Sequence, residues 1–345
     1  MNLIPVMRKF CSLQRWSLGF VLGVALATAG VAQVSIPQRV GNGVIGEAPY
    51  ASTGILETRF GRSYFRGSGT IARDPRLIFT AAHVSFDRGR WADEISIAIA
   101  WNGGSDAPLG RYRTMRGYRF FSSYATNVAQ YGDESDEAFN TDFLVGFTTE
   151  YLGNAVGVRS DGAGYLANGS IQKFILGYPS ERDLDGVNGY YYMHRTGPFN
   201  TVFTQILDAY YDVQNVSTGS GNSGGPVFET SSGSGVLAGI LISGTNRSAG
   251  VYAIDLPAWN VSSNALSALS SAPPAATPTP GSMTPGAGTP LPLSLALNEL
   301  NELRETLVAR MVQIRKIKNP QARVIQLRRI RTLLMQVNEQ IRATS

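Results

Sequence analysis

The interpretation of this 345-residue chain begins at one stretch, Gly219-Ser220-Gly221-Asn222-Ser223-Gly224-Gly225-Pro226. Its four glycines permit backbone dihedrals that a β-carbon would forbid, and they let the chain approach another group closely. The hydroxyl of Ser223 becomes a nucleophile once a neighbouring base accepts its proton. The oxyanion formed by such an attack needs donors, and the N–H groups of Gly221 and Ser223 are the candidates. Taken alone, the octet is also typical of a Gly/Ser loop between strands, so the rest of the sequence has to decide.

A base and an acid for this serine lie upstream. Thr80-Ala81-Ala82-His83 follows the apolar run 77–79, which predicts a strand with His83 at its end. Asp142 opens a second apolar run, 143–147, so its carboxylate is placed to hold the imidazole in one tautomer. Asp133 and Asp136 compete for this role, but neither opens an apolar strand. The order His, Asp, Ser is the chymotrypsin order among the three known for this triad.

Together these motifs resemble the trypsin-like (chymotrypsin-fold) serine proteases over residues 40–261, about two thirds of the chain. The resemblance rests on TAAH at 80–83, the Asp142 strand, GNSGGP at 221–226 and a GVY strand at 250–252. It implies an all-β domain, residues 33–262, built of two six-stranded-type antiparallel barrels. Alternation of short apolar runs with turn residues from 55 to 101 independently favours an all-β fold.

The resemblance also implies an activity and assigns roles. A serine endopeptidase would use Ser223 as nucleophile, His83 as base and Asp142 to orient His83, with the N–H groups of Gly221 and Ser223 as the oxyanion hole. The alternative is a binding or scaffold protein that keeps the protease fold and has little turnover. No cofactor or metal is expected: the acidic run 133–137 contains hard-cation ligands, but a solvated insertion is favoured because it lacks a recognisable metal-loop pattern.

Five residues fall in the family's substrate-binding site: Ser217, Thr218, Ser243, Gly244 and Gly250. A neutral Ser217 at the base of the specificity pocket and a glycine at 250 imply apolar or aromatic side chains, not Lys or Arg. Thr218 matches a threonine of glutamyl endopeptidases, but their acid-binding histidine falls at Ile242. The family's Ser-Trp-Gly reads Ser243-Gly244-Thr245, so placing Gly244 in the pocket wall requires a one-residue gap.

The start of the chain predicts export. Residues 1–32 have a basic beginning, an apolar stretch from Trp16 to Ala29 and small residues suited to cleavage, ending at Ala29 or Ala32. The protein is therefore expected to be secreted or periplasmic, with an uncleaved membrane anchor as the alternative. The only cysteine, Cys11, lies in this segment, so the mature chain would have no disulfide.

The junction Arg39-Val40 resembles the activation site of trypsin-like zymogens. In such an activation the new amine pairs with an aspartate directly before the nucleophilic serine, and here that position is Asn222. A neutral amide cannot supply the buried ion pair on which the switch depends. Asn222 also makes the motif resemble the HtrA-type and glutamyl endopeptidase branches. We therefore expect residues preceding Val40 to leave activity intact.

The end of the chain differs in composition from the rest. Residues 263–292 carry no charge and consist mainly of Ser, Ala, Pro, Thr and Gly, which predicts a linker. Residues 293–345 predict two basic amphipathic helices, broken at Asn319-Pro320 and folded back as a hairpin with coiled-coil spacing in its second half. Such a hairpin is expected to associate with a second copy or with the cell envelope. Nucleic acid is disfavoured, because exported proteins rarely meet it.

Overall fold

The computed structural model describes residues 34–103, 112–180, 192–230 and 235–271, and helical positions 301, 304, 305, 308 and 311. All of them belong to one compact unit of the chain, residues 34–345. The expected signal segment at 1–32 lies outside the described residues. The same holds for 272–292 of the expected linker and for the expected hairpin at 293–345, apart from the five helical positions.

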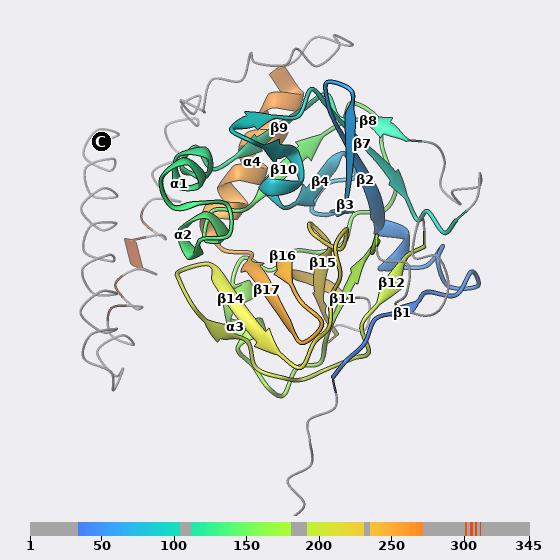
Figure 1. Ribbon diagram of the computed structural model, residues 1–345, viewed down its shortest axis with the longest axis vertical. Coiled ribbons are helices and arrows are strands. Elements are labelled where there is room, and N and C mark those ends of the chain that lie inside the picture. The colour runs from blue at the N-terminus through green and yellow to red at the C-terminus, as the bar shows by residue number, and fades with distance from the viewer. Residues whose placement is uncertain are drawn as a thin grey trace, which may run out of the picture. The chain divides into compact units, whose positions relative to one another are not determined.

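The first half of the chain forms a seven-stranded antiparallel sheet in the order β8-β7-β2-β3-β4-β10-β9 (Figure 1). Its strands are β2 (Thr53–Phe60), β3 (Ser63–Ile71), β4 (Leu77–Thr80), β7 (Glu94–Ile99), β8 (Arg113–Thr114), β9 (Gly117–Phe120) and β10 (Leu144–Phe147). The small hairpin β5 (Phe86–Asp87) and β6 (Arg90–Trp91) stands apart from it. Gly61, at φ +64°, opens the two-residue turn between β2 and β3, a conformation that most residues avoid.

The second half forms an eight-stranded antiparallel sheet in the order β1-β12-β11-β15-β16-β17-β14-β13. Its strands are β1 (Gln38–Arg39), β11 (Lys173–Gly177), β12 (His194–Arg195), β13 (Thr204–Gln205), β14 (Tyr210–Gln214), β15 (Pro226–Glu229), β16 (Val236–Gly244) and β17 (Ser248–Ala253). The all-β class is confirmed. Both sheets exceed six strands because two-residue edge strands, which leave no pattern in the sequence, extend them.

Few helices accompany the sheets in the described part of the chain. They are the 3₁₀ turns η1 (Tyr50–Ser52) and η2 (Ala82–Ser85) and the α-helices α1 (Ser123–Tyr131), α2 (Asp136–Phe139), α3 (Gly162–Leu166) and α4 (Leu256–Ser271). The acidic insertion forms the start of α2, where the Ser135 hydroxyl accepts the Ala138 N–H at 3.2 Å. Two acidic side chains in this first turn suit the positive end of the helix dipole. No group of three or more metal-ligand side chains comes together among the described residues.

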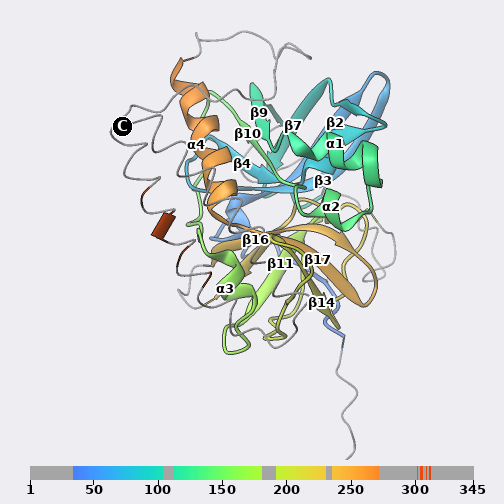
Figure 2. The same cartoon turned by 90° about the vertical axis from the view of Figure 1, so that its left-hand side faces the viewer.

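Helix α4 corrects the expected domain boundary at 262. The helix continues to Ser271, so the first nine residues of the expected linker belong to it. Ala258, Val261 and Ala265 recur at helical spacing and are buried, and α4 packs against β9 and β10 (Figures 1 and 2). Alanine and serine suggested a linker by composition, yet alanine is the best helix former and its small side chain fits close packing. No described helix has the length and apolar character needed to cross a membrane.

Arg73 attaches α4 to the first sheet. Its guanidinium lies 3.8 Å above the Trp259 ring and donates to the Trp259 carbonyl at 3.0 Å and to the Ser263 hydroxyl at 2.9 Å. A cation over an aromatic ring contributes about 0.5–2 kcal/mol, depending on how far both are removed from water. The contact therefore stabilises the part of α4 that the sequence assigned to the linker.

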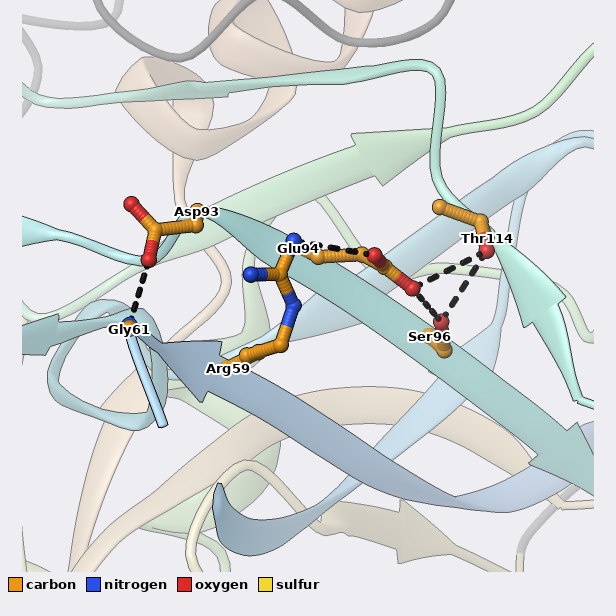
Figure 3. A network of polar contacts seen from close by, with 6 residues as sticks. All are labelled: Arg59, Gly61, Asp93, Glu94, Ser96 and Thr114. Atoms are coloured by element: carbon orange, nitrogen blue, oxygen red, sulfur yellow. Dashed lines mark hydrogen bonds and ion pairs between the residues drawn. The ribbon is translucent and has the colours of Figure 1, made fainter. Parts of the chain in front are cut away.

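A polar network fixes the register at the β7 side of the first sheet (Figure 3). Arg59 on β2 pairs with Glu94 on β7 at 3.3 Å, and the two residues are also partners in the strand ladder. Glu94 accepts from the Ser96 and Thr114 hydroxyls at 3.3 and 3.4 Å, which ties β8 to the same point. Each exposed pair contributes little energy, about 1 kcal/mol or less, so the network specifies alignment more than stability.

Candidate active site

His83 is held at the end of a fully buried strand. All four residues of β4 are buried, and so are Ala81 and Ala82, which join the strand to His83 in η2. The backbone that leads to the imidazole is therefore fixed by the core. The side chain of His83 itself is half-buried and keeps access to the surface.

Asp142 is brought to His83 by the pairing of β10 with β4. Leu144 lies opposite Thr80 in this ladder, which places the residues before β10 beside the residues after β4. Asp142 is 1% exposed, its Oδ1 accepts the His83 backbone N–H at 2.9 Å, and its Oδ2 lies 2.6 Å from His83 Nδ1. An ionised carboxylate can only accept, so Nδ1 carries the proton and Nε2 is left as an acceptor.

Two opposing effects set the pKa of His83. Burial by itself lowers this pKa, because it disfavours the charged imidazolium. The negative charge of Asp142, its hydrogen bond and the more distant charge of Asp133 together outweigh burial, so the pKa of His83 stands above its ordinary value. The imidazole is thus made a stronger base by its partner.

The loop that carries Ser223 requires its glycines. Gly221 has φ +88°, and a β-carbon there would lie 2.5 Å from the Tyr178 carbonyl oxygen. Gly224 has φ +80°, and a β-carbon there would overlap the Thr80 hydroxyl and the Ser68 carbonyl. Both contacts are too short for any real side chain. The glycines therefore let the loop press against β11 on one side and the first sheet on the other.

Ser68 joins this loop to the first sheet, a role that the sequence did not reveal. Its N–H donates to the Ser223 carbonyl at 2.7 Å and its hydroxyl donates to the Gly221 carbonyl at 2.8 Å. The same hydroxyl accepts the Tyr178 N–H at 2.9 Å, and the Ser68 carbonyl accepts the Thr80 hydroxyl at 2.8 Å. The available signal was the run Gly-Ser-Gly inside a strand, since glycines in strands often mark close approach of another backbone.

Gly67 marks the place where the His83 and Ser223 loops meet. A β-carbon on Gly67 would lie 2.6 Å from the Val84 side chain and 3.1 Å from the Ser223 carbonyl oxygen. Val84 follows His83 directly in the chain. Val84 and Ser223, which are 139 positions apart in the sequence, therefore both lie against Gly67 of β3.

Two backbone donors beside Ser223 are unused. The N–H groups of Asn222, Gly224 and Gly225 each donate to a carbonyl, at 3.1, 2.7 and 2.9 Å. Within the described part of the chain, the N–H groups of Gly221 and Ser223 have no acceptor, and the Ser223 hydroxyl makes no hydrogen bond. Gly221 and Ser223 are half-buried, so their N–H groups are accessible to solvent or to a bound group.

The five predicted substrate-binding residues form two contact pairs and one neighbour. A β-carbon on Gly244 would meet the Thr218 side chain, and one on Gly250 would meet the Ser243 hydroxyl. Ser217, next to Thr218, is 5% exposed. The β16–β17 ladder shifts by one residue between Leu241 and Ser243. At this point β16 contains one residue more than its partner β17.

Tyr210 is a neighbour of this region that the sequence did not single out. A β-carbon on Gly250 would lie 3.0 Å from the Tyr210 ring and 3.3 Å from the Tyr210 hydroxyl. The ring also packs against Phe139 at the end of α2, with 5.2 Å between centroids. Aromatic residues alternating on a strand are typical of packing, so no local signal distinguished this one.

Other candidates lie away from the His83–Asp142 pair. Asp136 is exposed in the first turn of α2, and Asp133 is exposed before it. His194 is buried in β12, where its Nδ1 lies 3.1 Å from the Tyr192 carbonyl oxygen. Asn222 is 3% exposed, and its side-chain oxygen has no partner among the described residues. The Val40 N–H donates to the Met193 carbonyl at 2.8 Å.

No family model matches the chain, and no curated protein sequence matches it. The structure is similar to protease Anisep from Arthrobacter nicotinovorans, at 18% identity and a TM-score of 0.49, over 64% of this chain and 98% of that one. It is also similar to the thermostable serine protease AL20 from an extremophilic microorganism, at 15% identity and a TM-score of 0.48, over 61% of this chain and 94% of that one. Neither likeness extends to the activity of this chain.

Proposed function

We propose that the chain is a serine endopeptidase that hydrolyses peptide bonds through an acyl-enzyme intermediate. One observation carries the proposal. A loop with a free serine hydroxyl and two free N–H donors meets, at Gly67, the residue that follows a histidine whose Nδ1 is held by a buried carboxylate. Each feature alone is also compatible with a purely structural role, but hydrolysis of an amide needs all of them together.

The roles follow from the atoms that are free. Ser223 Oγ attacks the carbonyl carbon of the substrate while its proton moves to Nε2 of His83. The developing oxyanion accepts from the N–H groups of Gly221 and Ser223. His83 then gives the proton to the leaving amine, and a water molecule, activated by the same nitrogen, hydrolyses the acyl-enzyme. Asp142 stabilises the imidazolium throughout, because it holds Nδ1–H at 2.6 Å.

A preference for apolar or aromatic side chains before the cleaved bond belongs to the same proposal. It is supported by the neutral Ser217 and by the absence of side chains at Gly244 and Gly250. Thr218 is buried and its hydroxyl has no partner among the described residues, which adds polarity without charge. Profiling on a peptide library should show Leu, Phe or Tyr at this position. A strict preference for Lys, Arg or Glu would contradict it.

Export and association are proposals supported by sequence alone. Residues 1–32 support a secreted or periplasmic protein. The basic amphipathic pattern of 293–345 supports self-association or envelope binding.

The test is labelling of the mature protein with a fluorophosphonate probe, alongside hydrolysis of casein. We expect labelling of the unaltered chain, loss of labelling in Ser223→Ala, and loss of hydrolysis in both Ser223→Ala and His83→Ala by about four orders of magnitude. Ser220→Ala is the matched control, because Ser220 is an exposed serine of the same loop. An unaltered protein that neither labels nor hydrolyses would instead support a binding protein on a protease fold.

A further inference from the structure

Residues that precede Val40 are built into the second sheet. The Ser35 N–H donates to the Asn215 carbonyl at 2.8 Å, and the Ser35 carbonyl accepts the Ser217 N–H at 2.9 Å. Ser35 and Val216 form a parallel bridge through this pair of bonds. The segment thus adds a strand-like partner to 215–217, a stretch that includes the predicted substrate-binding residue Ser217 and directly precedes Thr218.

The same segment continues along another strand of the sheet. Gln38 and Arg39 form β1, whose partners in β12 are Arg195 and His194. The Arg39 guanidinium lies 3.5 Å above the Tyr192 ring. A cut between Arg39 and Val40 would therefore release a segment with backbone pairing at both of its ends.

Residues 215–218, which pair with this segment, are held by hydrogen bonds from two sides. Asn215 has φ +63°, a left-handed conformation that costs energy and persists only when its surroundings hold it. Its N–H donates to the Arg247 carbonyl at 2.7 Å, and the Thr218 N–H donates to the Thr245 carbonyl at 2.9 Å. Those bonds hold 215–218 from the β16–β17 side. On the other side, Ser35 supplies the acceptor for Ser217 and the donor for Asn215.

We infer that residues 34–39 stay in the active enzyme and position the substrate-binding segment 215–218 through the backbone of Ser35, so that removing them at Arg39 weakens substrate binding. The inference rests on the proposed endopeptidase function. Cleavage of the Arg39-Val40 bond would activate a trypsin-like zymogen, whereas here it is expected to lower activity. Signal cleavage at either position that the sequence suggests, after Ala29 or after Ala32, leaves Ser35 in the mature chain.

The test begins with Ser35→Pro in a chain that starts at Gln33. Proline removes the N–H that bonds to Asn215 and the exposed hydroxyl that donates to the Gly197 carbonyl at 3.2 Å, and it keeps the backbone carbonyl. Ile36→Pro is the matched control, because Ile36 is 55% exposed and its N–H has no acceptor among the described residues. Peptide hydrolysis measures the use of the substrate site, and the rate of fluorophosphonate labelling measures the nucleophile without it.

We expect Ser35→Pro to raise KM about fivefold, the factor that corresponds to one net hydrogen bond, with kcat and labelling within about twofold. Ile36→Pro should match the unaltered chain. An unchanged KM in Ser35→Pro, or equal changes in the two variants, would overturn the inference. Absence of labelling and hydrolysis in the unaltered chain would count against the endopeptidase proposal itself, before any variant is considered.

A second experiment covers the case in which Ser35→Pro does not fold. A chain that starts at Val40 is assayed with and without a synthetic peptide of residues 33–39. Saturable recovery of peptide hydrolysis, by a fall in KM, supports the positioning role. A chain from Val40 that is as active as the longer one, or one that the peptide does not restore, contradicts it.

Discussion

Replacing Asp142 by asparagine tests the geometry around His83 most directly. The carboxylate satisfies two donors of His83, the backbone N–H at 2.9 Å and Nδ1–H at 2.6 Å, in a site that is 1% exposed. An amide of the same shape has one acceptor and one donor group. If its oxygen faced Nδ1, its NH₂ would oppose the backbone N–H, and an unsatisfied buried donor costs about 1–3 kcal/mol.

The amide is therefore expected to turn its NH₂ toward Nδ1. This nitrogen must then accept, the ring proton moves to Nε2, and the base can no longer take a proton from Ser223. We expect kcat to fall about 10⁴-fold, equivalent to about 5.5 kcal/mol in the activation free energy. Steady-state hydrolysis of a peptide substrate measures the loss, and thermal unfolding shows whether the variant is folded.

Asp136→Asn is the control for this substitution. It makes the same chemical change at an exposed carboxylate in the first turn of α2. Activity within about twofold is expected there, since a surface charge at a helix start contributes only about 0.3–1 kcal/mol to stability. Near-normal activity in Asp142→Asn, or a large loss in Asp136→Asn, would refute the assignment of the third role.

Three further predictions concern the loop, the pH dependence and the boundary. Gly221→Ala should lower the free energy of unfolding by about 1–3 kcal/mol in chemical denaturation, because of its φ of +88°, and should lower kcat about 10²-fold or more, because it displaces an oxyanion donor. Gly43→Ala, with open space around it, should change neither stability nor kcat. Asp133→Asn removes a charge that raises the pKa of the proposed base, so the acid limb of the kcat/KM profile should move to lower pH, and a move to higher pH would contradict this. A chain ending at Ser271 should keep full hydrolysis and its unfolding midpoint. One ending at Val261 loses the second part of α4, including the buried Ser262 and Ala265, and should melt earlier; equal midpoints would show that 262–271 contribute nothing to stability.

Local sequence was enough to find the residues of the candidate site but not to choose among all of them. The glycines lie within a few residues of Ser223, and the buried strand lies within a few residues of His83. Each of these patterns can therefore be recognised in a short window of sequence. Only one sequence feature distinguished Asp142 from Asp133 and Asp136 as the residue that orients His83: Asp142 opens an apolar run. The structure brings Asp142 to His83 across 59 residues through the β4–β10 ladder and leaves the other two exposed.

Sequence by itself determined the all-β class and the motifs, because strand periodicity, turn glycines and a strand-end histidine are encoded in short windows. Tertiary structure alone decided how those windows meet. Ser68 bonds to Gly221 across 153 residues, and Ser35 bonds to a segment 180 residues later, and nothing in the sequence around either serine specifies that distant partner. Helix α4 reached into the expected linker for the same reason: its alanines gain stability only when the first sheet covers them. Hydrogen bonds and burial between distant segments depend on the whole packed chain, so no local pattern records them.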